Sequence, residues 1–340
     1  MILIAYGTRP EWLKVKPIIK SLRTNKISHR VLFTGQHKNI SGNYYDIKLE
    51  MCAKIFSRLD QVFVSILNEI DKKDAFKNIS AVLVQGDTAS VFALSLAAFH
   101  RKIKLIHLEA GLRTYDKDNP YPEEMYRQMV SRIADYHLCP NENNKINLEK
   151  EKTSGEKFVI GNTALDNISN ISTSYEDVVL ITMHRRENLE LISHWFDVFD
   201  ILAEENSQVD FVLPVHPNPT IINHSKKLKN VRVIDAMKHD DLIDILRRAK
   251  VVITDSGGIQ EESSFLRKKC IVCRKTTERV ESIDQNSILC NDPDQLQCIF
   301  ERCINDFKIK DSYSCPYGDG KASLNFVNLI KSGKIKIKSI

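Results

Sequence analysis

The chain has 340 residues, of which 42% are hydrophobic and 27% charged, and its formal net charge is +5. This length exceeds one small core and suits two domains. The modest charge and the scattered lysines argue against nucleic-acid binding, and the basic residues 331–338 fit a solvated tail. We find no apolar run of membrane-spanning length and no signal peptide, so we expect a cytoplasmic protein without membrane insertion.

Eight cysteines raise the question of disulfides or a metal site. Cys270 and Cys273 form a CxxC pair, but they lie inside a strand-like run with no second CxxC or histidine pair nearby. Cys139 and Cys290 end other apolar runs, where a thiol acts as a small hydrophobic group. We therefore expect reduced, buried thiols and no metal site.

Residues 1–166 alternate between short apolar runs and amphipathic stretches. The amphipathic stretches, such as 11–22 and 90–100, predict helices. The alternation predicts a parallel sheet with helical crossovers. The expected strands are 2–6, 30–34, 81–84, 104–108, 136–139 and 158–160.

The strand pattern restarts after residues 167–177, a polar stretch rich in Asn, Ser and Thr. The expected strands of this second half are 178–183, 211–215, 231–234, 251–254, 270–274 and 287–289. We predict an α/β protein of two Rossmann-like domains, 1–166 and 167–318, whose parallel sheets face a central cleft. Residues 319–340 are expected to form a helix or tail that packs back toward the first domain.

Two glycines after the run 251–254 form the strongest single motif. In the segment Asp-Ser-Gly-Gly-Ile-Gln-Glu, residues 255–261, they let backbone N–H groups and a helix dipole approach a phosphate. Glu262 lies one turn further on, where it could hold a ribose hydroxyl, and Arg279 and His184 can bind phosphate. Neither a P-loop nor a GxGxxG motif is present. A diphosphate held by donors and cations points to a nucleotide leaving group.

The first half is rich in carboxylates near strand ends. Carboxylates gathered in a partly dry cleft acquire separate pKa values and can divide acid and base roles. An alternative is that each one caps a helix or pairs with arginine, which we leave open for Glu124. The carboxylates are Asp87, Glu109, Glu123 and Glu124, and the cations that could balance them are Arg9, Lys14, Arg113 and Arg127. His107 fits a core histidine better than a catalyst, and His184 is a better candidate than His216.

Ten motifs occur in order between residue 1 and about residue 323: GTRPEWLK, QGDT, HLEAGLRT, PYPEE, GNT, HRREN, PVHPNP, DSGGIQEES, TTER and YGDGKAS. This set resembles the non-hydrolysing UDP-N-acetylglucosamine 2-epimerases. The resemblance implies a GT-B architecture, a homodimer, no cofactor, and interconversion of UDP-GlcNAc and UDP-ManNAc. It also implies that the C2 proton is removed as UDP leaves anti from C1, giving 2-acetamidoglucal, to which UDP re-adds.

The resemblance also assigns roles by motif position. Asp87, Glu109 and Glu123 become the acid/base set, and His184 lies at the diphosphate and the glycosidic oxygen. Met237 belongs to a loop whose main chain can read uracil, and Leu242 stands where the family often has an aromatic residue against uracil. The residues expected to hold UDP and sugar are Arg9, Lys14, Ser256, Gly257, Gly258, Glu262 and Arg279.

Several positions depart from the family pattern. Tyr126 replaces the usual Asn after PEE, and the segment around residues 51–60 is trimmed. These changes favour UDP-GlcNAc but allow a related UDP-2-acetamido sugar. Many family members also bind UDP-GlcNAc as an activator, and the corresponding residues here are Gln36, His37, Asn39, Arg58 and His216. Because Asn39 is one methylene shorter than the common Gln, we expect weakened or absent activation.

Three other functions remain open at this point. A GT-B glycosyltransferase would need an acceptor site, for which the acidic set is poorly suited. A hydrolysing epimerase would release free ManNAc, and it usually lacks the GLRT, PEE and SGGIQEE forms. A non-catalytic nucleotide-sugar sensor would not need Asp87, Glu109 and Glu123.

Overall fold

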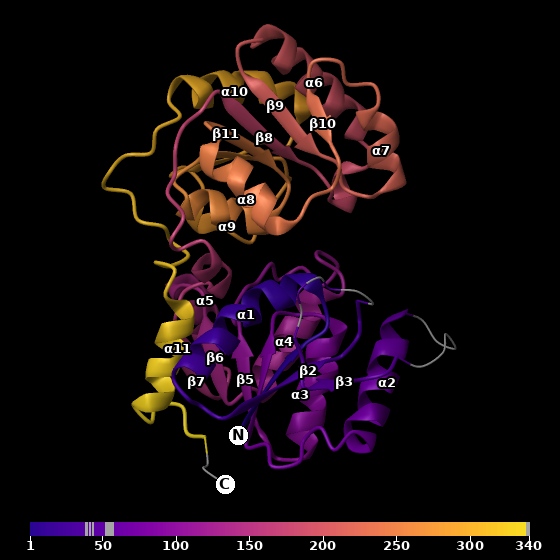
Figure 1. Cartoon of the computed structure of the whole chain (residues 1–340), viewed down its shortest axis with the longest axis vertical. Helices are drawn as coiled ribbons and strands as arrows, with labels where there is room; N and C mark the ends of the chain where they lie inside the picture. The colour runs from indigo at the N-terminus through magenta and orange to yellow at the C-terminus, as the bar shows by residue number, and fades with distance from the viewer. Residues whose placement is uncertain (38–39, 41, 43, 52–57, 338–340) are drawn as a thin grey trace. The chain divides into compact units, whose positions relative to one another are not determined.

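The computed structural model describes residues 1–37, 40, 42, 44–51 and 58–337. The chain divides into two compact units (Figure 1). Unit 1 comprises Met1–Ser169 together with the described part of Gly318–Ile340, and unit 2 comprises Asn170–Tyr317.

Unit 1 contains a parallel sheet with the strand order β3-β2-β1-β4-β5-β6-β7. Its strands are β1 (Ile2–Tyr6), β2 (His29–Phe33), β3 (Ile47–Lys48), β4 (Ala81–Gln85), β5 (Lys104–Leu108), β6 (Tyr136–Cys139) and β7 (Glu156–Val159). Its helices are α1 (Arg9–Thr24), α2 (Arg58–Lys72), α3 (Ala89–His100), α4 (Glu123–Ile133), α5 (Glu142–Lys150), α11 (Ala322–Lys331) and the 3-10 helix η1 (Thr163–Asn167).

The two faces of this sheet bury alternate residues of each strand, as the pleat requires. On β1, Ile2 and Ile4 pack with α1 and α11, whereas Leu3 and Ala5 pack with α2, α3 and α4. Because both faces are covered, the central strands β1 and β4 are mainly apolar, as the sequence pattern indicated.

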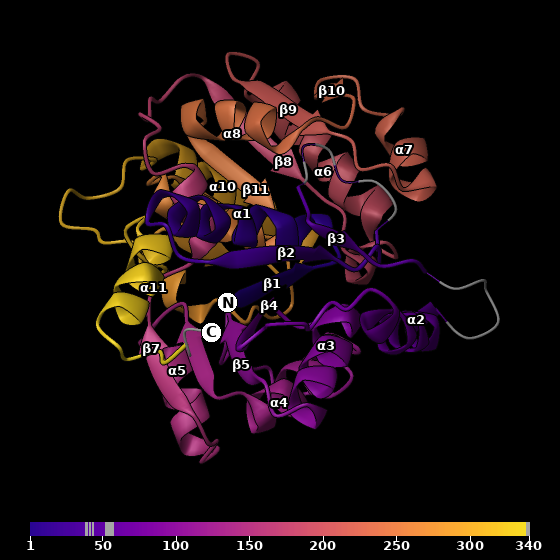
Figure 2. The same ribbon diagram turned by 60° about the horizontal axis from the view of Figure 1, so that its bottom comes forward.

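Helix α11 belongs to unit 1 although it follows unit 2 in sequence (Figures 1 and 2). Phe326 and Val327 are buried in the same hydrophobic cluster as β1 and α1. Asp166 accepts hydrogen bonds from the backbone N–H groups of Ala322 and Ser323, at 3.0 and 2.7 Å, and so holds the first turn of the helix.

Unit 2 contains a second parallel sheet with the order β10-β9-β8-β11-β12-β13. Its strands are β8 (Val178–Thr182), β9 (Asp210–Pro214), β10 (Arg232–Ile234), β11 (Val251–Thr254), β12 (Lys269–Val272) and β13 (Ser287–Leu289). Its α-helices are α6 (Ile192–Glu205), α7 (Pro219–Ser225), α8 (His239–Arg248), α9 (Gly257–Phe265) and α10 (Leu296–Asn305), and its 3-10 helices are η2 (Arg186–Asn188), η3 (Val280–Ser282) and η4 (Pro293–Gln295). Helices α6, α7 and α10 share one hydrophobic cluster with the sheet, while α8 and α9 pack against β8, β11 and β12 (Figure 1).

The segment 167–177 is attached to unit 1 at one end and to unit 2 at the other. The Asn167 amide donates to the carbonyl of Leu13 at 2.8 Å. Lys268 is fully buried; its Nζ donates to the carbonyl of Ser174 at 2.5 Å and lies 4.0 Å from the centroid of the Tyr175 ring. Burial lowers the pKa of Lys268 to about 8. Residues 170–173 therefore form the part of the segment between the two attachments.

The predicted strands all occur, with ends that differ by one or two residues. Strand β7 begins two residues earlier than predicted, at Glu156, because Glu156 and Lys157 pair with β6 through their backbone although their side chains are polar. The strand ends one residue before the predicted Ile160. Strand β3 was not predicted, since two residues give no period. No helix in the described part of the chain is long and apolar enough to cross a membrane.

The described cysteines are free thiols. Cys270 is fully buried within strand β12 and Cys273 follows that strand, equally buried. Burial raises the pKa of the Cys270 thiol to about 12. Among the described residues no group of three or more His, Cys, Asp or Glu side chains is placed to hold a metal ion.

Candidate active site

The carboxyl ends of β1, β4 and β5 bring three predicted residues to one edge of the unit 1 sheet. These strands are neighbours and run parallel. Arg9 opens the helix after β1, Asp87 lies in the loop after β4, and Glu109 directly follows β5. Ligand sites of open α/β sheets form at this edge.

Glu109 is held by two neighbouring side chains. Both the ammonium of Lys14 and the amide of Gln85 donate to its carboxylate, and its side chain is 9% exposed. Its backbone has a φ of +65°, a left-handed conformation that costs energy for any residue other than glycine. Such strain is concentrated at functional sites, where it fixes the direction of a side chain.

Asp87 pairs with a different cation. The Nε and Nη2 atoms of Arg127 lie 3.1 and 2.6 Å from the same carboxylate oxygen, Oδ2. The Arg127 side chain is 6% exposed and that of Asp87 25% exposed. Each of the two carboxylates at this edge thus has its own counter-ion. The Asp87 side chain is the more exposed of the two.

Glu124, the first-half carboxylate whose role was left open, is structural. It is fully buried and accepts hydrogen bonds from the backbone N–H groups of Thr114 and Tyr115, at 3.0 and 3.2 Å. One of its oxygens also lies 3.4 Å from Nη1 of Arg127. Its neighbour Glu123 begins α4 and is half-buried. Glu124 therefore shapes the loop before α4, which is the structural alternative left open for it.

Arg113 does not balance the acidic set, contrary to expectation. Its guanidinium is buried against Glu151, with Nε 2.6 Å from Oε1, and it also donates to Ser131. His107, in contrast, is the core histidine that we expected: it is fully buried, and its Nε2 lies 2.8 Å from the carbonyl oxygen of Gly86. Burial lowers the pKa of His107 to about 3, so the ring is neutral at physiological pH.

In unit 2, the first turn of α9 leaves its backbone donors available to a ligand. Ser256 is the N-cap residue, but its side chain forms no capping hydrogen bond with this helix. Its backbone N–H donates to Oγ1 of Thr254 at 2.9 Å, which turns the chain at the end of β11. Gly258 is exposed. A helix N-terminus of this kind attracts phosphate.

The side chain of Arg279 packs against Gly257. A Cβ atom on Gly257 would overlap the guanidinium, so only glycine fits. The guanidinium is bound by two carboxylates: Nε donates to Glu261 at 2.7 Å, and Nη1 donates to Glu278. Burial opposes ionisation of Glu278, but Arg279 and Arg274 outweigh it and hold its pKa well below the usual range. Arg279 therefore supports the Gly257 turn, and its contact with UDP stays a prediction.

His184 follows β8 and is oriented by a buried carboxylate. Asp255 is fully buried and accepts hydrogen bonds from the backbone N–H groups of His184 and Arg185. The Nδ1 atom of His184 lies 3.2 Å from Oδ1 of Asp255, and the His216 ring stacks on His184 with centroids 5.5 Å apart. Burial lowers the pKa of His184, while Asp255 partly offsets this effect. With Nδ1 turned to Asp255, Nε2 is the nitrogen that can meet a ligand.

Glu262 carries an unsatisfied oxygen. It is 5% exposed, and its Oε1 atom lies 2.7 Å from Nε2 of His239. Its Oε2 atom is buried and has no hydrogen-bond partner among the residues that the structure describes. A buried carboxylate oxygen without a donor is costly. A ribose hydroxyl would satisfy it, which fits the role predicted for Glu262.

The loop proposed to read uracil borders a pocket of about 750 Å³ in unit 2. Met237 lies two residues before α8 begins, and Leu242 lies within α8; both are half-buried. The pocket is lined by Val215, Pro217, Val233, Ile234, Asp235 and Ala236, among others.

The residues of the predicted effector site lie in both units. In unit 1, Gln36 Oε1 accepts from the Ser90 hydroxyl at 2.7 Å, and His37 Nδ1 accepts from the backbone N–H of Arg9 at 3.3 Å. Burial, and then the charge of Arg58, lower the pKa of His37. His216 belongs to unit 2 and contacts His184. Asn39 lies outside the described residues.

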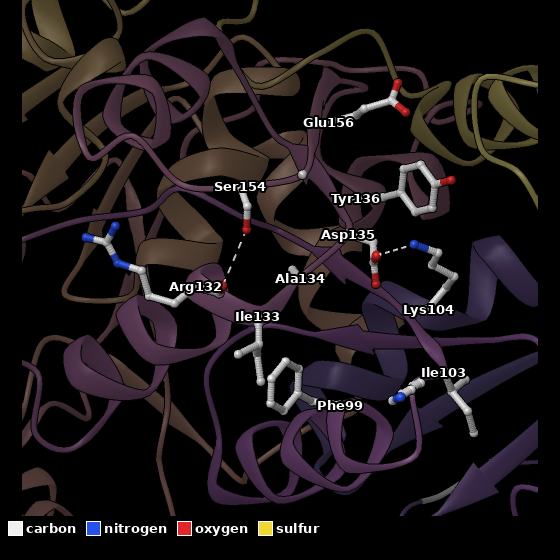
Figure 3. A pocket seen from close by; sticks show the side chains of 12 residues that line it. Phe99, Ile103, Lys104, Arg132, Ile133, Ala134, Asp135, Tyr136, Ser154 and Glu156 are labelled. Atoms are coloured by element: carbon white, nitrogen blue, oxygen red, sulfur yellow. Dashed lines mark hydrogen bonds and ion pairs between the residues drawn. The ribbon is translucent and has the colours of Figure 1, made fainter.

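A pocket of about 670 Å³ lies at the opposite edge of the unit 1 sheet, where β5, β6 and β7 begin (Figure 3). Two interactions occur among the residues of this pocket: Lys104 donates to Asp135 at 2.6 Å, and Ser154 donates to the carbonyl of Arg132 at 3.5 Å (Figure 3). None of the predicted site residues lines it.

Sequence reasoning missed three residues that hold the site together. Asp255 and Glu11 lie inside recognised motifs, but nothing in one sequence shows that they are buried acceptors. His239 lies 23 residues before Glu262, and only the packing of α8 beside α9 brings them together. Spacing in the sequence therefore gave no signal for these partners.

The chain is similar to known proteins over nearly its whole length. Residues 20–331 match the family model described as UDP-N-acetylglucosamine 2-epimerase. The chain is 34% identical to UDP-N-acetylglucosamine 2-epimerases of Campylobacter jejuni (98% of each chain covered) and Bacillus subtilis (96% of this chain and 93% of that one). A crystal structure of the Neisseria meningitidis UDP-GlcNAc 2-epimerase bound to UDP-GlcNAc superimposes with a TM-score of 0.84, at 31% identity over 97% of this chain and 99% of that one.

MurG of Acinetobacter baumannii, 12% identical over 97% of this chain and 99% of that one with a TM-score of 0.55, shares the fold alone. The two parallel-sheet units therefore form a GT-B fold, as predicted. The chain belongs to the UDP-N-acetylglucosamine 2-epimerase family.

Proposed function

We propose that this enzyme interconverts UDP-GlcNAc and UDP-ManNAc by inverting C2 of the sugar, without a cofactor. The observation that supports this proposal best is the pair of carboxylates, Asp87 and Glu109, at one edge of the unit 1 sheet with separate counter-ions. Proton removal from one face of C2 and delivery to the other face needs acid/base groups whose proton affinities differ. Glu123, at the start of α4, completes the proposed set.

The chemical step is an elimination followed by its reverse. A carboxylate takes the proton of C2, the C–H electron pair forms the C1–C2 double bond, and the C1–O pair leaves with the diphosphate. The product pair is 2-acetamidoglucal and UDP. UDP then adds back to C1 while a carboxylic acid gives a proton to the other face of C2. Because a C2–H that is not alpha to a carbonyl is very weakly acidic, departure of a stabilised diphosphate makes its removal feasible.

Unit 2 supplies the UDP-binding groups in this proposal. The open N-terminus of α9 binds the diphosphate through the backbone N–H groups of Gly257 and Gly258. The backbone N–H of Ser256 already donates to Thr254, so Ser256 contributes its hydroxyl. Glu262 accepts a ribose hydroxyl at Oε2. Arg9 and Lys14 of unit 1 are also proposed to bind the UDP-sugar.

His184 is proposed to act on the leaving group. Asp255 occupies the Nδ1 side of the ring. The neutral ring presents Nε2 as an acceptor, and a diphosphate would favour the protonated form, which donates there. A proton at this position stabilises the negative charge that develops on the departing oxygen.

The proposal extends to a cytoplasmic homodimer, which the family resemblance implies. It also includes the possibility that the sugar is another UDP-2-acetamido sugar, since Leu242 and Tyr126 depart from the family pattern. A panel of UDP-2-acetamido sugars, with turnover measured for each, distinguishes these substrates.

Proton NMR of UDP-GlcNAc with the enzyme alone tests the function. We expect new signals of UDP-ManNAc that grow to a constant ratio with UDP-GlcNAc. Free ManNAc would show a hydrolysing epimerase instead. No change would indicate a sensor or a glycosyltransferase that needs an acceptor, and either result would contradict the proposal.

A further inference from the structure

Glu11 is a buried carboxylate with no role in the proposed reaction. It is 2% exposed and forms the capping box of α1 with Thr8, the N-cap residue. In a capping box the glutamate accepts only the N–H of the N-cap residue. Here Oε2 accepts from the backbone N–H groups of both Gly7 and Thr8, at 2.5 and 3.1 Å. The second oxygen is thereby free for a partner on another element.

That partner is Thr88, the N-cap residue of α3. Its hydroxyl donates to Oε1 of Glu11 at 2.6 Å, and its Oγ1 accepts from the backbone N–H of Val91 at 3.3 Å. One carboxylate therefore connects the N-caps of two helices, which follow the adjacent parallel strands β1 and β4.

The residues next to these two caps are the proposed functional ones. Arg9 follows Thr8, and Asp87 precedes Thr88. The two loops that the Glu11 bridge joins therefore carry Arg9, which is proposed to contact the sugar nucleotide, and Asp87, which is proposed as an acid/base group. A shift of either loop would change the distance between Asp87 and a bound substrate.

Keeping a carboxylate in this place is costly. Its donors are the neutral N–H groups of Gly7 and Thr8 and the hydroxyl of Thr88, and burial raises the pKa of Glu11 to about 7. A buried bridge between two loops accounts for a carboxylate here better than capping alone, because capping uses only one of its two oxygens.

We propose that Glu11 is a positioning residue of the active site, which fixes Asp87 and Arg9 relative to each other by joining the loop after β1 to the loop after β4. This proposal rests on the function proposed for Asp87 and Arg9. Glu11 is enclosed by its three donors, so it acts through these loops and not by touching the substrate.

Two substitutions of Glu11 separate positioning from proton transfer. In Glu11→Gln the amide oxygen can still accept from Gly7 and Thr8, and the amide NH2 can donate to Thr88 Oγ1, so the bridge survives with one bond reversed. In Glu11→Ala the bridge is lost. We expect Glu11→Gln to retain kcat within about threefold of wild type, the scale of less than one hydrogen bond.

We expect Glu11→Ala to lower kcat by at least about tenfold and to slow exchange of the C2 proton with solvent, because a misplacement of about 1 Å can cost about 10²-fold. Equal losses in Glu11→Gln and Glu11→Ala would overturn the proposal, since the charge itself would then be required. A folded Glu11→Ala variant with the wild-type kcat would overturn it as well.

Thr88→Val tests the bridge from its other end and keeps the proposal falsifiable if Glu11→Ala does not fold. Its control is Thr153→Val: Thr153 also lies in unit 1 and donates to the carbonyl of Leu148 at 3.1 Å, away from the site, and it is buried where Thr88 is half-buried. We expect a lower kcat for Thr88→Val only. Equal kcat for the two variants would count against the bridge. Asp87→Asn is measured in parallel, because the wild-type rate there would refute the proposed function independently of the Glu11 series.

Discussion

The candidate groups of the two units differ in how their charges are satisfied. In unit 1 the acidic side chains already have partners: Arg127 binds Asp87, and Lys14 binds Glu109. In unit 2 the first turn of α9 has no capping side chain from Ser256, and Glu262 has a buried oxygen with no partner among the described residues. The first arrangement suits proton transfer by groups that are fixed before substrate binds. The second suits a ligand that brings the missing partners.

This contrast predicts that substitutions of the unit 1 carboxylates affect turnover and that substitutions at the N-terminus of α9 affect binding. The largest effect is expected for Asp87→Asn, Glu109→Gln and Glu123→Gln. Each should lower kcat by at least about 10²-fold, the usual contribution of a positioned acid or base. UDP affinity, measured by calorimetry, should change far less. Wild-type rates in all three variants would refute the acid/base assignment.

Glu124→Gln is not a suitable control for this series. Glu124 is fully buried and holds the backbone of Thr114 and Tyr115. A better control is Glu149→Gln, because Glu149 lies on α5 of the same unit and its exposed carboxylate forms an ion pair with Lys145 at 3.9 Å. We expect this control to retain the wild-type kcat, as median surface ion pairs contribute little.

Gly258→Ala tests the binding side of the comparison. A Cβ atom there would meet only Ser256 Oγ, at 3.9 Å, so the protein itself tolerates it. Alanine also favours a helix over glycine. We therefore expect an unchanged or higher melting temperature, but an approximately tenfold weaker UDP affinity, the equivalent of one charge-assisted hydrogen bond. Unchanged UDP affinity would place the phosphate elsewhere.

A smaller effect concerns the protonation of His184. Burial lowers its pKa in the free enzyme, so the ring is mostly neutral near pH 7. An anionic diphosphate favours the imidazolium, which raises the pKa on binding, causes proton uptake and strengthens UDP affinity as the pH falls. Calorimetry in buffers of different ionisation enthalpy measures this uptake.

The difference between wild type and His184→Gln removes the contribution of UDP's own titration. His194→Gln is the matched control, because His194 is exposed and pairs with Asp294 in the same unit. We expect His184→Gln to take up fewer protons than the wild type and His194→Gln to match it. Equal proton uptake in all three proteins would contradict the role of His184.

The sequence was sufficient for the fold and for the order of the strands along it. Buried parallel strands are continuous apolar runs, and the motifs follow them, so the edge of the sheet could be predicted for Asp87, Glu109 and Ser256. The partners could not be predicted. Arg113 and Arg127 were both candidates to balance the carboxylates, yet Arg113 binds Glu151 and Arg127 binds Asp87. Glu11, Asp255 and His239 act through contacts between distant segments, which one sequence does not reveal.

The most direct test of the account follows the C2 hydrogen of the sugar. UDP-GlcNAc is incubated with the enzyme in D2O, and the product is examined by proton NMR. Because a carboxylate that removes the C2 proton exchanges it with solvent, or a second acid delivers another, we predict deuterium at C2 of UDP-ManNAc. Product that keeps protium at C2 in full would mean direct transfer or a hydride route, and would contradict proton transfer by the carboxylates of unit 1.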